Sequence, residues 1–189
     1  LPYLVTDEDG KTLGLIGLGT IGAAVAKRAQ GFDMNVVYYS RNRKPHYEKE
    51  YSIEWISDMG DLLSKSDYVS IHVALTEETK NLIGFDEISK MKESSFLINT
   101  SRGGTVDQDA LTKALEENMI AGAALDVTSP EPIDPNHPLV HMDNVVMTPH
   151  IASASSETYV RMSLMAADNI IKFFKNIDMP SCLNPEILK

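Results

Sequence analysis

The stretch Thr12-Leu13-Gly14-Leu15-Ile16-Gly17-Leu18-Gly19-Thr20-Ile21-Gly22 decides the fold. It opens with an apolar run, residues 12–17, of the length and composition of a buried strand, and residues 21–30 predict a helix. Between them lies the spacing GxGxxG. A strand, a glycine turn and a helix in this order are typical of a site that binds a dinucleotide. The alternative is a glycine turn that serves packing alone.

Each glycine has its own role in such a site. Gly17 allows the tight turn, Gly19 lets pyrophosphate approach the backbone, and Gly22 lets the helix pack closely on the strand. Thr20 and Ile21 begin the helix, whose free N–H groups and positive end would face the phosphates. We therefore expect these five residues to bind the cofactor.

Short apolar runs alternate with helical patterns along the rest of the chain. Strands separated by helices indicate parallel β-α units, so the predicted fold is α/β, a single Rossmann-type domain with a doubly wound parallel sheet. Further strands are expected at residues 35–40, 68–73, 95–99, 121–127 and 144–148. Helices are expected at residues 58–64, 86–91, 107–118 and 155–175. Residues 41–56 are polar and are expected to be mostly loop.

The ends of two predicted helices carry further information. Asp107 is expected to cap the helix that follows it. The helix over residues 155–175 has apolar residues at spacings of three and four, which predicts one buried face. These residues are Val160, Leu164, Ala167, Ile171 and Phe174. We expect residues 1–9 to form a linker, residues 10–154 the dinucleotide-binding domain, and residues 155–189 a long helix and a C-terminal tail.

Composition and charge exclude several classes of protein. The 189 residues suffice for one domain with a full core, and the net charge of −10 disfavours a nucleic-acid binder. Cys182 is the single cysteine, so no internal disulfide forms and a cytoplasmic location is expected. No apolar run is long enough for a membrane span, and no His or Cys pair has zinc spacing, so neither membrane nor metal is expected. Because the chain starts at Leu1, we expect a fragment of a longer protein.

The end of the second predicted strand selects the cofactor. An NAD site usually places Asp or Glu about 20 residues past the glycines, on the ribose 2′-hydroxyl. Here that place holds Ser40, followed by Arg41 and Arg43. A carboxylate would repel a 2′-phosphate, whereas hydroxyl and guanidinium groups would bind it, so we expect NADP to be preferred over NAD. The alternative is a solvated basic loop in an enzyme that uses either cofactor.

Three segments that follow predicted strands hold the candidate catalytic residues. In Asn99-Thr100-Ser101-Arg102-Gly103-Gly104, Arg102 suits bidentate capture of a substrate carboxylate, unless it forms a surface salt bridge. In Ser129-Pro130-Glu131-Pro132, two prolines restrict the loop around Glu131, which is otherwise an exposed loop acid. Asp126, at a strand end, could bond the nicotinamide carboxamide or ribose.

His150 completes this set in Thr148-Pro149-His150. Reduction of a ketone requires hydride on carbon and a proton on oxygen, and imidazole is the usual proton donor near neutral pH. A nearby Glu131 would stabilise the imidazolium. A structural histidine is the alternative. Among the other histidines, His72 lies in a strand pattern and is expected to pack or to line the site, and His137 and His141 are expected to lie in a surface loop.

These motifs together resemble the D-isomer-specific 2-hydroxyacid dehydrogenase family. The resemblance runs from about Gly10 to the end of the chain. Its motifs stand in the family's order as residues 17–22, Ser101-Arg102-Gly103, Leu125-Asp126-Val127, Glu131-Pro132, Pro149-His150 and Ser153-Ala154. It implies hydride transfer between a nicotinamide cofactor and a 2-keto or 2-hydroxy acid.

The resemblance also implies residue roles. Arg102 would bind the substrate carboxylate and polarise the keto group, His150 would be the acid/base, and Glu131 would pair with it. Asp126 would touch the nicotinamide end. Other residues expected beside the cofactor are Val73, Ala74, Leu75, Thr79, Thr100, Ser101 and Ala152, and Arg102 and His150 are expected to contact it as well. Many relatives have glycine in place of Ala152, whose methyl group could crowd the nicotinamide. Formate-specific relatives have Gln in place of Glu131, which counts against that chemistry.

Within the family, the chain looks most similar to glyoxylate/hydroxypyruvate reductases. A lactate or phosphoglycerate dehydrogenase is the alternative substrate class, and a nucleotide-sensing corepressor-like module the alternative kind of protein. The resemblance implies a homodimer formed through this domain. It also implies a substrate domain whose N-terminal part this chain lacks and towards which residues 155–189 lead back. We therefore expect the chain alone to bind cofactor weakly and to turn over poorly, since closure around the substrate needs both walls of the cleft.

Overall fold

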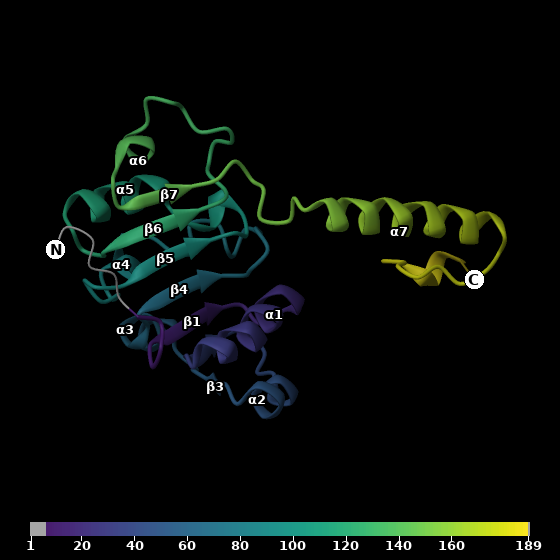
Figure 1. The fold of residues 1–189 in the computed structure, drawn as a ribbon, viewed down its shortest axis with the longest axis horizontal. Coiled ribbons are helices and arrows are strands. Elements are labelled where there is room, and N and C mark those ends of the chain that lie inside the picture. Colours follow the sequence, from purple (N-terminus) through teal and green to yellow (C-terminus); the bar gives the residue numbers. More distant parts are fainter. Residues whose placement is uncertain (1–6, 189) are drawn as a thin grey trace. The chain divides into compact units, whose positions relative to one another are not determined.

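The computed structural model describes residues 7–188, and the chain divides into two compact units that meet between His150 and Ile151. The first unit holds a seven-stranded parallel sheet in the order β3-β2-β1-β4-β5-β6-β7 (Figure 1). Its strands are β1 (Thr12–Ile16), β2 (Asn35–Tyr39), β3 (Glu54–Trp55), β4 (Tyr68–Ile71), β5 (Phe96–Asn99), β6 (Gly122–Leu125) and β7 (Val145–Met147). The order runs outward from β1 in both directions, which confirms the doubly wound fold.

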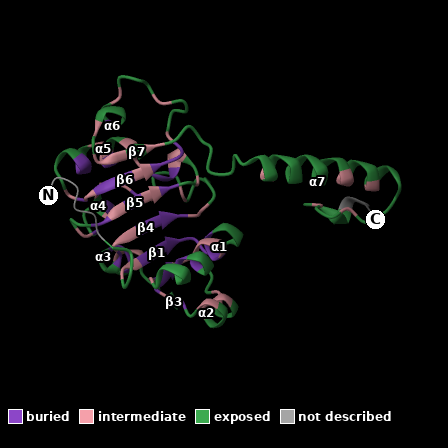
Figure 2. Cartoon of the chain, viewed as in Figure 1, coloured by how far each residue is buried: buried purple, intermediate pink, exposed green. Residues whose placement is uncertain are grey.

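Helices cover the sheet in two layers. They are α1 (Thr20–Ala29), α2 (Pro45–Tyr51), α3 (Met59–Lys65), α4 (Phe85–Ile88), α5 (Gln108–Glu116) and α6 (Pro138–His141). The larger core joins α3, α4 and α5 to one face of the sheet, and the smaller core joins α1 to β1 and β2 on the other. Ala23, Ala26 and Ala29 are the buried side chains of α1 in that contact, and their small size lets the helix lie close to the strands. Buried residues concentrate in the strands (Figure 2).

The expectation of a loop over residues 41–56 is wrong, because α2 and β3 form there. Pro45 occupies the first turn of α2, where its missing N–H costs nothing. Tyr47, Tyr51 and Trp55 pack against the smaller core, so this polar segment has one apolar face. A surface loop was also expected around His137 and His141, but α6 forms between them, with His137 as its cap.

The predicted cap of α5 is confirmed, since the Asp107 side chain accepts a hydrogen bond from the N–H of Ala110. His72 follows β4 directly, and its N–H donates to the carbonyl of Ile16 at 2.7 Å. Burial lowers the pKa of His72 to about 4, so its imidazole is neutral near pH 7. Ser70 Oγ lies 3.0 Å from its Nε2. His72 is half-buried and also lines a groove beside α1, which agrees with the expectation of a packing or lining residue.

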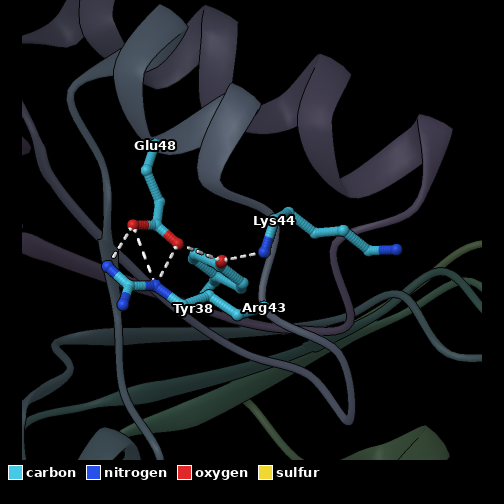
Figure 3. A network of polar contacts seen from close by, with 4 residues as sticks. All are labelled: Tyr38, Arg43, Lys44 and Glu48. Carbon is cyan, nitrogen blue, oxygen red and sulfur yellow. Dashed lines mark hydrogen bonds and ion pairs between the residues drawn. The ribbon is translucent and has the colours of Figure 1, made fainter.

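A polar network joins α2 to β2 (Figure 3). The Tyr38 ring is fully buried, and its hydroxyl donates to Glu48 Oε1 and accepts from the Lys44 N–H, each at 2.7 Å. Arg43 donates to both carboxylate oxygens of Glu48 at 2.7 to 3.2 Å. Burial raises the pKa of Tyr38 to about 12, which keeps the hydroxyl protonated. The network fixes the chain between β2 and α2.

The second unit consists of α7 (Ser156–Phe174), a short tail and a 3-10 helix (Pro185–Leu188). The Ser155 side chain caps α7 by accepting from the Thr158 N–H at 3.1 Å. The apolar residues of this helix are exposed, so the face that the sequence predicts to be buried is not covered by the described residues of this unit. Too little chain belongs to this unit to cover them. Among residues 7–188, no helix is both long and apolar enough to cross a membrane.

Replacing Glu48 by Gln tests the network through its pH dependence. The pKa of Glu48 is lowered from the ordinary 4.5, first by the hydrogen bond from Arg43 and then by that from Tyr38. A carboxyl group with a lower pKa in the folded chain stabilises it fully above its unfolded pKa, and that contribution is lost as the pH falls through the folded pKa. In urea denaturation, we expect Glu48→Gln to lower the free energy of unfolding more at pH 7 than at pH 3.5. Glu54→Gln, at an exposed residue, is the control, and an equal loss at both pH values would contradict the prediction.

Candidate active site

The glycine turn brings β1, β4 and α1 into contact. Gly17 has a φ of +95°, and an added Cβ would lie 2.7 Å from the carbonyl oxygen of His72. An added Cβ on Gly22 would lie 2.5 Å from the carbonyl oxygen of Gly17. Gly19 differs, because no atom lies within 4 Å of the place where its Cβ would be. Gly17 and Gly22 are thus required for packing, and Gly19 leaves the backbone at the start of α1 open to a ligand.

A cleft of about 310 Å³ lies beside this turn. Six residues predicted to bind the cofactor line it: Gly17, Ser40, Arg41, Val73, Ala74 and Thr79. They come from the carboxyl ends of β1 and β2 and from the loop after β4, since these strands are neighbours in the sheet.

Some polar side chains in this region already have partners. Ser40 Oγ donates to the Asn42 carbonyl at 2.8 Å. Thr79 Oγ1 donates to the Ala74 carbonyl at 2.6 Å, which holds the loop after β4. Arg43 forms an ion pair with Glu48, and its guanidinium carbon is 5.6 Å from the centre of the Trp55 ring. Because these contacts hold it elsewhere, Arg43 does not line the cleft. Arg41 is the guanidinium that faces the cleft.

The loop after β5 carries Arg102, and a buried asparagine holds it. Asn99 is 1% exposed, and its Oδ1 accepts from the N–H and the hydroxyl of Ser101 at 3.0 and 2.8 Å. Its Nδ2 donates to the Arg102 carbonyl at 3.0 Å. Sequence reasoning missed this role of Asn99. A polar amide at the end of an apolar strand was the available signal, because such a group is buried only when it is bonded.

The loops after β5 and β6 are packed against each other. A Cβ on Gly103 would overlap the Thr128 carbonyl group, so only glycine allows this approach. Gln108, the first residue of α5, also joins the loops, because its Oε1 accepts from the Ser129 N–H at 3.0 Å. The residue after Arg102 is thereby held beside the loop that carries Glu131.

Glu131 and His150 meet as predicted. His150 Nδ1 lies 2.6 Å from Glu131 Oε1, and both side chains are partly exposed. The two residues line a cavity of about 490 Å³ together with Asp126 and Thr148. Asp126 is 4% exposed, and Thr148 Oγ1 donates to its Oδ1 at 2.5 Å. A buried carboxylate and a carboxylate-backed imidazole therefore border one cavity.

The remaining predicted residues are not all gathered at this cavity. The exposed Arg102 donates from Nη1 to the Ser101 carbonyl at 2.7 Å and does not line the cavity. Leu75 packs near Gly104, and Thr100 lines a separate groove beside α1. Thr20 and Ile21 are exposed in the first turn of α1. Ala152 belongs to the second unit.

The family is established by comparison with known proteins. Residues 2–152 match the family model for the D-isomer specific 2-hydroxyacid dehydrogenase, NAD binding domain. The chain belongs to this family.

Among residues 7–188, no three His, Cys, Asp or Glu side chains are grouped so as to hold a metal ion.

The chain is also similar in sequence and in structure to individual proteins. The chain is 50% identical over 183 residues to a glyoxylate reductase of Korarchaeum cryptofilum, covering 97% of this chain and 55% of the relative. It is 43% identical to the TT0316 protein from Thermus thermophilus, with a TM-score of 0.88 over 95% of this chain and 56% of that one. The NAD complexed form of a D-isomer specific 2-hydroxyacid dehydrogenase from Lactobacillus delbrueckii ssp. bulgaricus is 32% identical, with a TM-score of 0.88 over 96% of this chain and 58% of that one. The chain spans about half the length of the curated relatives it matches.

Gly103→Ala tests the contact between the two loops. The added methyl group would meet the Thr128 backbone, which cannot move aside as a flexible side chain could. We expect the free energy of unfolding, measured by urea denaturation, to fall by about 2 kcal/mol. Gly31→Ala is the control, because no atom lies within 4 Å of its Cβ position. Equal stability of the two variants would show that the loops are not tightly packed.

Proposed function

We propose that residues 10–154 are the dinucleotide-binding domain of an NADP-preferring oxidoreductase that reduces a 2-keto acid, with glyoxylate or hydroxypyruvate as substrate. The proposal depends on the His150–Glu131 pair, 2.6 Å apart, which lies at the same edge of a parallel sheet as the glycine turn. Residues 155–189 would return to a substrate domain outside this chain, in a cytoplasmic homodimer. The similarity of the chain to the glyoxylate reductase from Korarchaeum cryptofilum supports glyoxylate as the substrate.

His150 is the proton donor of the proposed reaction. Glu131 accepts from Nδ1–H and stabilises the imidazolium, which leaves Nε2–H to protonate the keto oxygen. Bound nicotinamide would supply the hydride that reaches the keto carbon. Arg102 would hold the substrate carboxylate through its guanidinium. Asp126, oriented by Thr148, would accept a hydrogen bond at the nicotinamide end.

The dinucleotide would lie along the carboxyl edge of the sheet. Thr20, Ile21 and the open backbone at Gly19 would bind pyrophosphate at the start of α1. Arg41 would bind the 2′-phosphate in the cleft beside the glycine turn. Ser40 would bind it as well once its hydroxyl leaves the Asn42 carbonyl. Arg43 would join them only after leaving Glu48. A relative in an NAD complexed form keeps open the alternative that either cofactor is used.

His150→Ala in the full-length protein tests the chemistry. Removing a general acid lowers kcat by about 10²–10⁴-fold, whereas the dissociation constant for NADPH should change little, because few of the proposed cofactor contacts involve this side chain. Steady-state kinetics with glyoxylate and fluorescence titration with NADPH measure the two quantities. His141→Ala, at the exposed end of α6, is the control. An unchanged kcat would rule out His150 as the proton donor.

Arg41→Ala tests the cofactor preference. A charge-assisted hydrogen bond to a 2′-phosphate contributes on the order of tenfold in affinity. We expect the dissociation constant to rise about tenfold for NADPH and to stay within twofold for NADH. Lys49→Ala removes a positive charge from α2 and is the control. A wild-type protein that binds NADH more tightly than NADPH would refute the preference.

A further inference from the structure

We propose that Glu78 is a second cofactor-specificity residue, whose carboxylate accepts a hydrogen bond from the ribose 2′-hydroxyl of NAD and repels the 2′-phosphate of NADP. This inference rests on the proposed placement of the adenosine end beside Ser40 and Arg41. Sites that bind NAD usually carry an acidic residue at the end of the second strand. Here Glu78, in the loop after β4, would take that role.

The charges that line the cleft support this assignment. Arg41 and Glu78 are the two charged residues among the described side chains that line it. Arg41 follows β2 and Glu78 lies in the loop after β4, on the two sides of β1 in the sheet. A 2′-substituent in this cleft therefore meets a guanidinium from one segment and a carboxylate from the other.

Local hydrogen bonds hold Glu78 in this position. Thr76 Oγ1 donates to Glu78 Oε2 at 2.8 Å. The Thr76 N–H donates to Thr79 Oγ1 at 2.7 Å, and Thr79 Oγ1 donates to the Ala74 carbonyl at 2.6 Å. The turn is thus fixed by its own side chains, so the carboxylate is presented by an ordered loop.

The ionisation of Glu78 agrees with this arrangement. Its pKa is lowered from the ordinary value, first by the Thr76 hydroxyl, then by its own backbone N–H, and also by the charge of Arg41. Glu78 is therefore a carboxylate at neutral pH, and it lies within electrostatic reach of Arg41.

The other polar groups near the cleft are less available for the 2′-group. Ser40 Oγ is bonded to the Asn42 carbonyl, and Arg43 is bonded to Glu48. The balance between Arg41 and Glu78 consequently sets the cofactor preference. A neutral residue in place of Glu78 would remove the repulsion of the phosphate and weaken the acceptor for a ribose hydroxyl.

Glu78→Gln is the test, with Glu77→Gln as a matched control. Both variants remove one negative charge from the same exposed loop, but Glu77 does not line the cleft. Dissociation constants for NADPH and NADH are measured on the 189-residue chain by NMR chemical-shift titration. We expect Glu78→Gln to raise the ratio of the NADH to the NADPH dissociation constant on the order of tenfold, and Glu77→Gln to change it less than twofold.

The same series separates this inference from the proposed function. If Arg41→Ala leaves the ratio unchanged, or if neither dinucleotide binds, the adenosine end is misplaced and both proposals fail. If Arg41→Ala lowers the ratio but the two glutamate variants behave alike, the placement holds and the role of Glu78 is refuted. A lower ratio in Glu78→Gln would refute it as well.

Discussion

The site depends on how closely the end of β1 approaches β4. Gly17 sits against the His72 carbonyl with a positive φ, and its N–H donates to the Tyr39 carbonyl at 2.8 Å. One glycine thereby fixes the ends of β1, β2 and β4 relative to one another. Gly22 then brings the first turn of α1 onto the same place. Because all strands are parallel, every loop that carries a polar site residue leaves the sheet at this edge.

Two regions of different character result along that edge. Near β2 and β4, opposite charges from Arg41 and Glu78 border a cleft, where the proposed recognition of the 2′-group would be electrostatic. Near β6 and β7, Glu131 and His150 form a directional hydrogen bond suited to proton transfer. Between them, backbone contact at Gly103 holds the loops after β5 and β6 together. The order of strands in the sheet thus separates the proposed cofactor cleft from the proposed proton donor.

Much of this arrangement could be predicted from the sequence, because glycine spacing and apolar periodicity report local physics. The glycine turn and the parallel sheet follow from such signals, whereas the pairing of Glu131 with His150 was implied by the resemblance to the family. The helix α2 was missed because its apolar face is made by tyrosines within a polar segment. Asn99 was missed because its role lies in tertiary hydrogen bonds. The periodicity of α7 indicates an apolar face but not the molecule that covers it.

His150 adopts a backbone conformation that a histidine rarely takes. Its φ of +55° lies in the left-handed region, held by N–H bonds to the Asp126 and Thr148 carbonyls. A side chain with a Cβ costs on the order of 1 kcal/mol there, whereas glycine adopts it freely. Laboratory evolution toward heat resistance alone would therefore favour glycine at this position, and the imidazole would survive only under pressure to turn over substrate.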